Sequence, residues 1–188
     1  MRWQQLFADL QAQFDAEEAA EDRMAGASRA RAEMGAVELV RRMRGSIGVP
    51  LTLRCRGAGP VVGTLTDVGV DWLLLEDEQG RSILVASAVV STVAGLGRLT
   101  AVEEGGAVHA RMDLRWALRG LARDRSPVQV VLDDGGVLTG TLDRVGADHV
   151  ELAEHSADVP RRAEAVHGVT AVVIRAIALL RTLPTGLG

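Results

Sequence analysis

Apolar and polar residues alternate along several short stretches of the chain, and such alternation predicts β-strands with one buried face. The clearest stretch covers residues 51–56, whose apolar positions are Leu51, Leu53 and Cys55. Residues 128–132 show the same phase of apolar positions further along the chain. The tetrapeptide Asp-Asp-Gly-Gly follows at 133–136 and predicts a hairpin turn, because Asp and Gly tolerate a positive φ angle. The pattern therefore predicts short strands joined by tight turns.

The strand pattern occurs twice, because the residues from 50 onward recur 77 positions later. The segment GTLTDVGVDWLLLED at 63–77 returns as GTLDRVGADHVELAE at 140–154. Across the 28 gapless positions from 50 to 77, nine residues are identical in the two copies. Chance would give about two identities, at roughly one match in fifteen. The chain therefore contains an internal duplication.

Each copy is expected to form five short strands, which in the first copy cover residues 51–56, 61–68, 72–75, 81–85 and 89–93. Gly69 and Gly146 follow the second strand of each copy, where a glycine predicts a bulge or a barrel corner. Because an open sheet would leave its edges exposed, we expect each copy to close into a barrel. The predicted fold is α+β, with two small five-stranded barrels, N-terminal helices and a connecting helix.

The segment VQVVLDDGGVLTGTLDRVGADHVEL at 128–152 resembles the first half of an Sm-like barrel. SH3-like barrels share this geometry, and the residues do not separate the two families. Sm-like RNA binders carry an Asp at the bend and an Asn a few residues later, whereas this chain has Gly69 and Gly146 at the bend and Trp72 and His149 near the Asn position. The resemblance thus implies the fold without the uridine site, and Trp72 and His149 become candidates for a diverged barrel mouth.

Helical periodicity marks the N-terminal region. Residues 2–23 predict an amphipathic helix whose apolar stripe is Trp3, Leu6, Phe7, Leu10 and Phe14. We expect this stripe to contact a protein partner or a second copy of the chain. The opening WQQLF segment also resembles that of uncharacterised actinobacterial proteins, which implies no function.

Further helices are expected from Ser28 to Arg44 and from Ala107 to Arg125. The second of these connects the two copies, and Trp116 is expected to pack it onto a barrel. The predicted organisation is an N-terminal helical segment at 1–46, a first barrel at 47–98, a connecting helix at 106–125 and a second barrel at 126–183.

Arginines recur every four residues along the connecting helix, and others precede the first copy. The set is Arg111, Arg115, Arg119 and Arg123 on the helix, with Arg41, Arg42 and Arg44 before the first strand. A ridge of this kind can contact phosphates, which predicts a nucleic-acid surface. The alternative, which we favour, is that these arginines pair with acidic residues of the N-terminal helix or are simply solvated.

Charge and composition narrow the class of protein. The net charge of the 188 residues is −4, which argues against coating nucleic acid through global positive charge. The single Cys55 allows no intramolecular disulfide and suits a reducing compartment. No apolar stretch resembles a signal peptide or a membrane span. We therefore expect a cytoplasmic protein without membrane contact.

The candidate residues for catalysis, metal binding and cofactor binding do not form a known motif. His149 and His155 are six residues apart, which matches neither a helix face nor a zinc finger. Cys55 lies in the apolar phase of a strand, which predicts a buried inert thiol. Asp71 and Asp148 recur with the repeat, and we expect each to brace a turn. We predict no catalytic residues, no metal site, no cofactor and no enzyme.

Two functions from different classes remain. The first is a non-catalytic interaction or scaffold protein, in which two linked barrels form a rigid body and the N-terminal helix binds a partner. The second is an RNA- or DNA-binding regulator that uses the arginine ridge. We favour the first, because the residues that bind RNA in the resembling family are missing and the chain is acidic overall.

Overall fold

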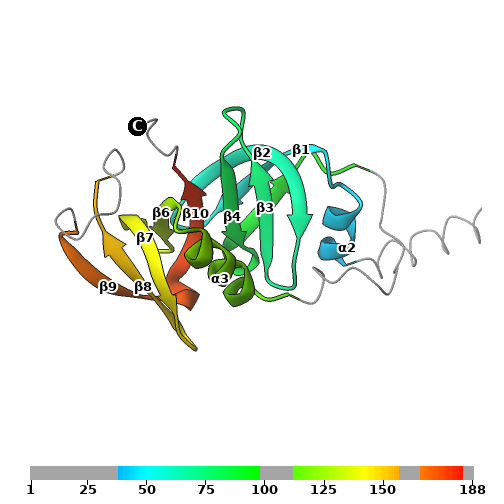
Figure 1. Cartoon of the computed structure of the whole chain (residues 1–188). Helices are drawn as coiled ribbons and strands as arrows, with labels where there is room; N and C mark the ends of the chain where they lie inside the picture. Colours follow the sequence, from blue (N-terminus) through cyan, green and yellow to red (C-terminus); the bar gives the residue numbers. More distant parts are fainter. Residues whose placement is uncertain (1–37, 98–111, 157–165, 184–188) are drawn as a thin grey trace, which may run out of the picture. The chain divides into compact units, whose positions relative to one another are not determined.

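The computed structural model describes residues 38–97, 112–156 and 166–183, which form one ten-stranded antiparallel sheet with two α-helices (Figure 1). The elements of the first repeat are α2 (Leu39–Arg44), β1 (Pro50–Cys55), β2 (Gly59–Val68), β3 (Trp72–Glu76), β4 (Ser82–Ala86), the 3₁₀ turn η1 (Ser87–Val89) and β5 (Val90–Ala94). Those of the second are α3 (Leu114–Asp124), β6 (Pro127–Leu132), β7 (Val137–Val145), β8 (His149–Glu154), β9 (Gly168–Val173), η4 (Ile174–Ala176) and β10 (Ile177–Thr182).

The strands lie in the order β5-β1-β2-β3-β4-β10-β6-β7-β8-β9. Each repeat contributes five neighbouring strands, and β4 of the first repeat pairs with β10 of the second. The prediction of two separate five-stranded barrels is therefore wrong, because the repeats share one open sheet. The expectation of several helices also fails within the described residues, where two α-helices occur.

The duplication extends to the register of strand pairing. Leu53 pairs with Val93 in the first repeat, and Val130 pairs with Leu180 in the second. The offset is 77 residues up to β8 and 87 residues from β9 onward, so the second repeat has ten extra residues between these strands. Both copies also carry a bulge at the same place in the second strand, between Leu65 and Asp67 and between Leu142 and Arg144.

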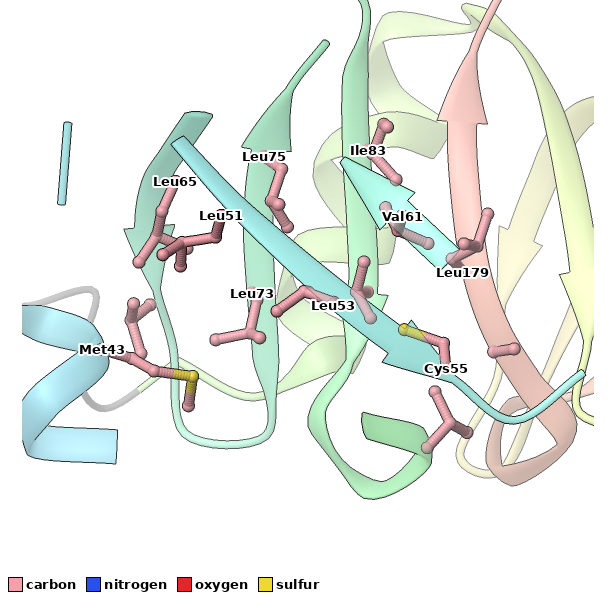
Figure 2. Packing of buried hydrophobic residues seen from close by; sticks show 14 of the residues in the cluster. Met43, Leu51, Leu53, Cys55, Val61, Leu65, Leu73, Leu75, Ile83 and Leu179 are labelled. Atoms are coloured by element: carbon pink, nitrogen blue, oxygen red, sulfur yellow. The ribbon is translucent and has the colours of Figure 1, made fainter. Parts of the chain in front are cut away.

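Two hydrophobic cores lie against the sheet, and the repeats exchange residues between them. Leu179 of β10 is buried in the core formed mostly by the first repeat, among residues such as Val61 and Cys55 (Figure 2). Conversely, Trp72 and Leu84 belong to the core formed mostly by the second repeat. The strands β4 and β10 are consequently buried on both faces, which explains why the repeats do not separate into two closed barrels.

The glycines after the second strands have a different role from the one expected. The bulges lie earlier in the strands, and Gly69 and Gly146 lie in the hairpin turns that follow. Each amide donates to the carbonyl three residues ahead, on Trp72 at 2.9 Å and on His149 at 2.8 Å. A Cβ at Gly69 would lie 2.2 Å from the Trp72 indole, and one at Gly146 would lie 2.6 Å from the His149 ring. Glycine is needed because a ring packs over the turn.

The predicted strand at residues 51–56 can be compared with the structure, whereas the predicted N-terminal stripe cannot. The strand at residues 51–56 buries Leu51, Leu53 and Cys55 as its pattern predicts. Burial raises the pKa of the Cys55 thiol, in agreement with an inert side chain. The N-terminal stripe of Trp3, Leu6, Phe7, Leu10 and Phe14 lies outside the described residues, as does Arg111.

Across residues 38–97, 112–156 and 166–183, the structure contains no helix that is both long and apolar enough to cross a membrane.

Candidate functional site

The start of α3 is fixed by the first-repeat turn between β2 and β3. The Asp71 carboxylate accepts a hydrogen bond from the Leu114 amide at 2.6 Å. The Met112 carbonyl accepts one from the Trp72 indole at 2.9 Å and another from the Val70 amide at 3.2 Å. Asp71 therefore holds a helix 43 residues away instead of bracing its own turn as expected.

The matching turn of the second repeat has a more exposed ring. The His149 ring, 42% exposed, lies 2.9 Å from the Asp148 carboxylate, and this bond is the main reason why the pKa of Asp148 is lowered. Arg115 of α3 donates to the Ala147 carbonyl at 3.1 Å. Trp72 is only 3% exposed, so of the two predicted mouth residues only His149 is accessible.

Asp113 is the N-cap of α3. Its carboxylate accepts a hydrogen bond from the Trp116 amide at 2.9 Å and forms an ion pair with Arg115 at 3.2 Å. The Trp116 amide, followed by Arg115, lowers the pKa of Asp113. Both partners favour the charged carboxylate, so α3 begins at a well-defined residue beside the β2–β3 turn.

A groove of about 410 Å³ runs between α3 and the strands β3, β4 and β10, and we call it the α3 groove. Its lining residues are Trp116, Ala117, Gly120, Leu121 and Asp124 from α3, Trp72 and Leu74 from β3, Ser82 and Leu84 from β4, Leu180 and Thr182 from β10, with Asp67 and Ser126. Most of these side chains are apolar, and the charged ones are both acidic. The groove thus combines an apolar lining with negative charge.

Two features of α3 keep the groove open. Trp116 is 44% exposed, so part of its indole is open to solvent at the side of the groove. Gly120 lines the groove one turn later, and a Cβ built there would meet nothing within 4 Å. A larger residue at 120 would occupy space that the native sequence leaves accessible.

Only some arginines of the predicted ridge are exposed to solvent. Arg115 is engaged with Asp113 and Ala147, whereas Arg119 and Arg123 are exposed. The other predicted cluster, Arg41, Arg42 and Arg44, lies on α2, where Arg42 donates to the Gly97 carbonyl at 3.3 Å. Arg119 and Arg123 are therefore the arginines of α3 that are most exposed to solvent.

A second cavity of about 530 Å³ lies where the repeats meet, and it brings together Asp71 and Asp148, which are equivalent residues of the two copies. Both carboxylates already have partners, in the Leu114 amide and the His149 ring. Arg175 also lines this cavity. Within the described residues, no group of three or more His, Cys, Asp or Glu side chains could hold a metal ion.

One buried polar pair lies away from both cavities. His155 is 3% exposed, and its Nε2 lies 2.8 Å from the Thr141 hydroxyl while its Nδ1 lies 2.9 Å from the Ser156 carbonyl. Both ring nitrogens are therefore satisfied by protein groups, which gives this histidine a structural role.

Comparison of the sequence with protein-family models and with curated proteins finds no match to either. The resemblance to Sm-like and SH3-like proteins therefore stays a prediction.

Sequence reasoning did not find the α3 groove. Its residues come from segments 67–84, 116–126 and 180–182, which only the sheet brings together. The signal that could have pointed to it is the glycine at 120 inside an otherwise helical pattern, since such a glycine often has a packing or functional reason.

Proposed function

We propose that this protein is a non-catalytic interaction protein of the cytoplasm, and that an amphipathic helix of a protein partner binds in the α3 groove. The observation that carries the proposal is the groove itself, about 410 Å³ in volume, with a half-exposed Trp116 at its side. Apolar grooves of this kind bind the apolar face of a helix, with anchors spaced by three or four residues.

Charge defines the partner further. The charged residues that line the groove, Asp67 and Asp124, are both acidic. A helix with apolar anchors and flanking Lys or Arg residues would complement this lining. Partly exposed tryptophans are frequent anchors of protein interfaces, because they combine large apolar area with few rotatable bonds.

The experiment places a photo-crosslinking amino acid at Trp116 in the full chain, within its native cell, and a matched one at the exposed Val137 as a control. The protein crosslinked only from position 116 is then purified, and its affinity is measured for the wild type and for Gly120→Trp. We expect filling the groove to weaken binding by about ten-fold or more, or at least about 1.4 kcal/mol. Equal affinities, or the same crosslinks from both positions, contradict the proposal.

Nucleic-acid binding is the second candidate, and the exposed Arg119 and Arg123 beside Trp116 favour it. Its test is binding of labelled single-stranded RNA at about 50 mM and about 200 mM salt, a range over which phosphate contacts weaken by orders of magnitude. Salt-sensitive binding that is lost in Arg119→Gln/Arg123→Gln would establish this function. The interaction proposal expects no tight binding at either salt concentration.

A further inference from the structure

We propose that copies of this chain assemble head to tail, with β9 of one copy pairing antiparallel with β5 of the next. The proposal goes beyond the α3 groove and does not depend on it. It rests on the way in which the duplication has already joined two repeats within one chain.

The junction between β4 and β10 is the template. By the offset of 87 residues, β9 is the second-repeat counterpart of β4, and β5 is the first-repeat counterpart of β10. Within the described residues, β5 pairs only with β1, and β9 pairs only with β8. The two free edges of the sheet are therefore the same two kinds of strand that pair inside the chain.

The outer face of β9 supports this reading. In β4, Leu84 and Ala86 are buried in the core of the next repeat. Their counterparts in β9, Ala171 and Val173, are exposed, and Val169 on the same face is 60% exposed. An apolar face that is covered in the first repeat is thus uncovered in the second.

The residues of the two edge strands do not oppose pairing with another strand. The sequences VSTVA of β5 and GVTAVV of β9 contain no charged residue and no proline. Proteins normally protect free edges with charges, prolines or bulges. β5 does have a bulge between Val90 and Thr92 where it pairs with β1, but β10 has the equivalent bulge between Ile177 and Leu179 and still pairs with β4. Two edges without charge or proline, one equivalent to β4 and the other equivalent to β10, favour pairing between copies.

The internal junction also predicts the register between copies. Leu179 pairs with Val85, Leu180 with Leu84 and Arg181 with Ile83. The corresponding pairs between copies are Thr92 with Val172, Val93 with Ala171 and Ala94 with Thr170. Thr92 replaces the buried Leu179 at this junction, so we expect the contact between copies to be weaker than the one within the chain.

The assembly is heterologous, because the two paired edges differ. Such contacts either close into a ring or continue as a filament, depending on the rotation between neighbours. Every copy then has both edges covered, except at the ends of an open filament.

The first test measures the molar mass of the full chain in solution across a range of concentrations, by light scattering or sedimentation. We expect species larger than one copy, and we expect the double variant Val169→Lys/Val173→Lys to be a monomer. Val137→Lys is the matched control, because Val137 is a similarly exposed valine on β7, and it should still assemble. A monomeric wild type, or an assembly unaffected by the β9 variant, overturns the proposal.

The second test checks the register in a Cys55→Ala background. The pair Val93→Cys/Ala171→Cys should form disulfides between copies, because directly opposed Cβ atoms lie within about 5.5 Å. The pair Val93→Cys/Val169→Cys is two residues out of register and should crosslink far less. Equal crosslinking overturns the register. Assembly lost through Trp3→Ala/Phe7→Ala but not through the β9 variant would instead assign self-association to the N-terminal stripe, and overturn the edge pairing.

Discussion

At the scale of single residues, the turn after the second strand of each repeat packs against an aromatic ring, and the two rings differ in burial. Trp72 is buried over Gly69 and donates to the Met112 carbonyl, whereas His149 lies over Gly146 and is 42% exposed. The first ring is fixed by the core and by α3. The His149 ring is partly exposed and can rotate away from the turn. A side chain at the glycine position should therefore be tolerated better in the second repeat than in the first.

This difference predicts unequal effects of two equivalent substitutions. In Gly69→Ala the new Cβ would lie 2.2 Å from a buried indole, and we expect a loss of about 1–3 kcal/mol in the free energy of unfolding. In Gly146→Ala the partly exposed His149 ring can rotate away, and we expect a loss below about 1 kcal/mol. Urea unfolding of both variants measures this, and equal losses would show that His149 is held as firmly as Trp72.

At the scale of elements, α3 depends on carboxylates at its start. Asp113 caps the helix, and Asp71 reaches it from the β2–β3 turn. The Trp116 amide and Arg115 lower the pKa of Asp113 in the folded protein. A carboxyl whose pKa is lower in the folded state stabilises it fully above the unfolded-state pKa, and this stabilisation is lost as the pH falls through the folded value.

We therefore expect Asp113→Ala to lower the free energy of unfolding by about 1 kcal/mol at neutral pH. The effect should shrink as the pH falls through the lowered pKa of the folded carboxyl, where the wild-type side chain loses its charge. Asp113→Asn is the control, because its side-chain oxygen still caps the helix and it does not titrate. Denaturant unfolding as a function of pH measures both variants. A loss from Asp113→Ala that is the same at every pH would contradict the assigned role of the charge.

Strands buried on one face and strands buried on both faces differ in how far the sequence predicts them. The alternation over residues 51–56 gives the buried face of β1 correctly, because only one face of that strand meets a core. The continuous apolar runs at 83–86 and 177–180 carried the missing information, since strands buried on both faces lose their alternation. The incorrect prediction of two separate barrels came from the expectation that an open sheet would leave its edges exposed.

At the scale of the whole molecule, the shared strands make the two repeats dependent on each other. Leu179 belongs to the second repeat, yet it is fully buried in the first core. Trp72 and Leu84 make the reverse exchange. Neither core is complete without residues from the other repeat, so we expect the two repeats to unfold together.

Leu179→Ala tests this dependence. The cavity opens in the first core, and we expect a loss of about 2–5 kcal/mol in the free energy of unfolding. Hydrogen exchange should show lower protection in β1, β2 and β3, although the substituted residue lies in β10. Leu180→Ala is the comparison, because its cavity opens in the second core. Protection lost only in β6, β7 and β8 of the Leu179 variant would show that the repeats are independent.

The sequence by itself determined the duplication, the first strands of each copy and the burial of Cys55, because these follow from local alternation and from direct comparison of two segments. Only the tertiary structure decided that β4 pairs with β10, that Trp72 is covered by α3 and that the α3 groove exists. These features depend on contacts between residues far apart in the chain. Local pattern reports which face of a strand is buried, but not which partner buries it.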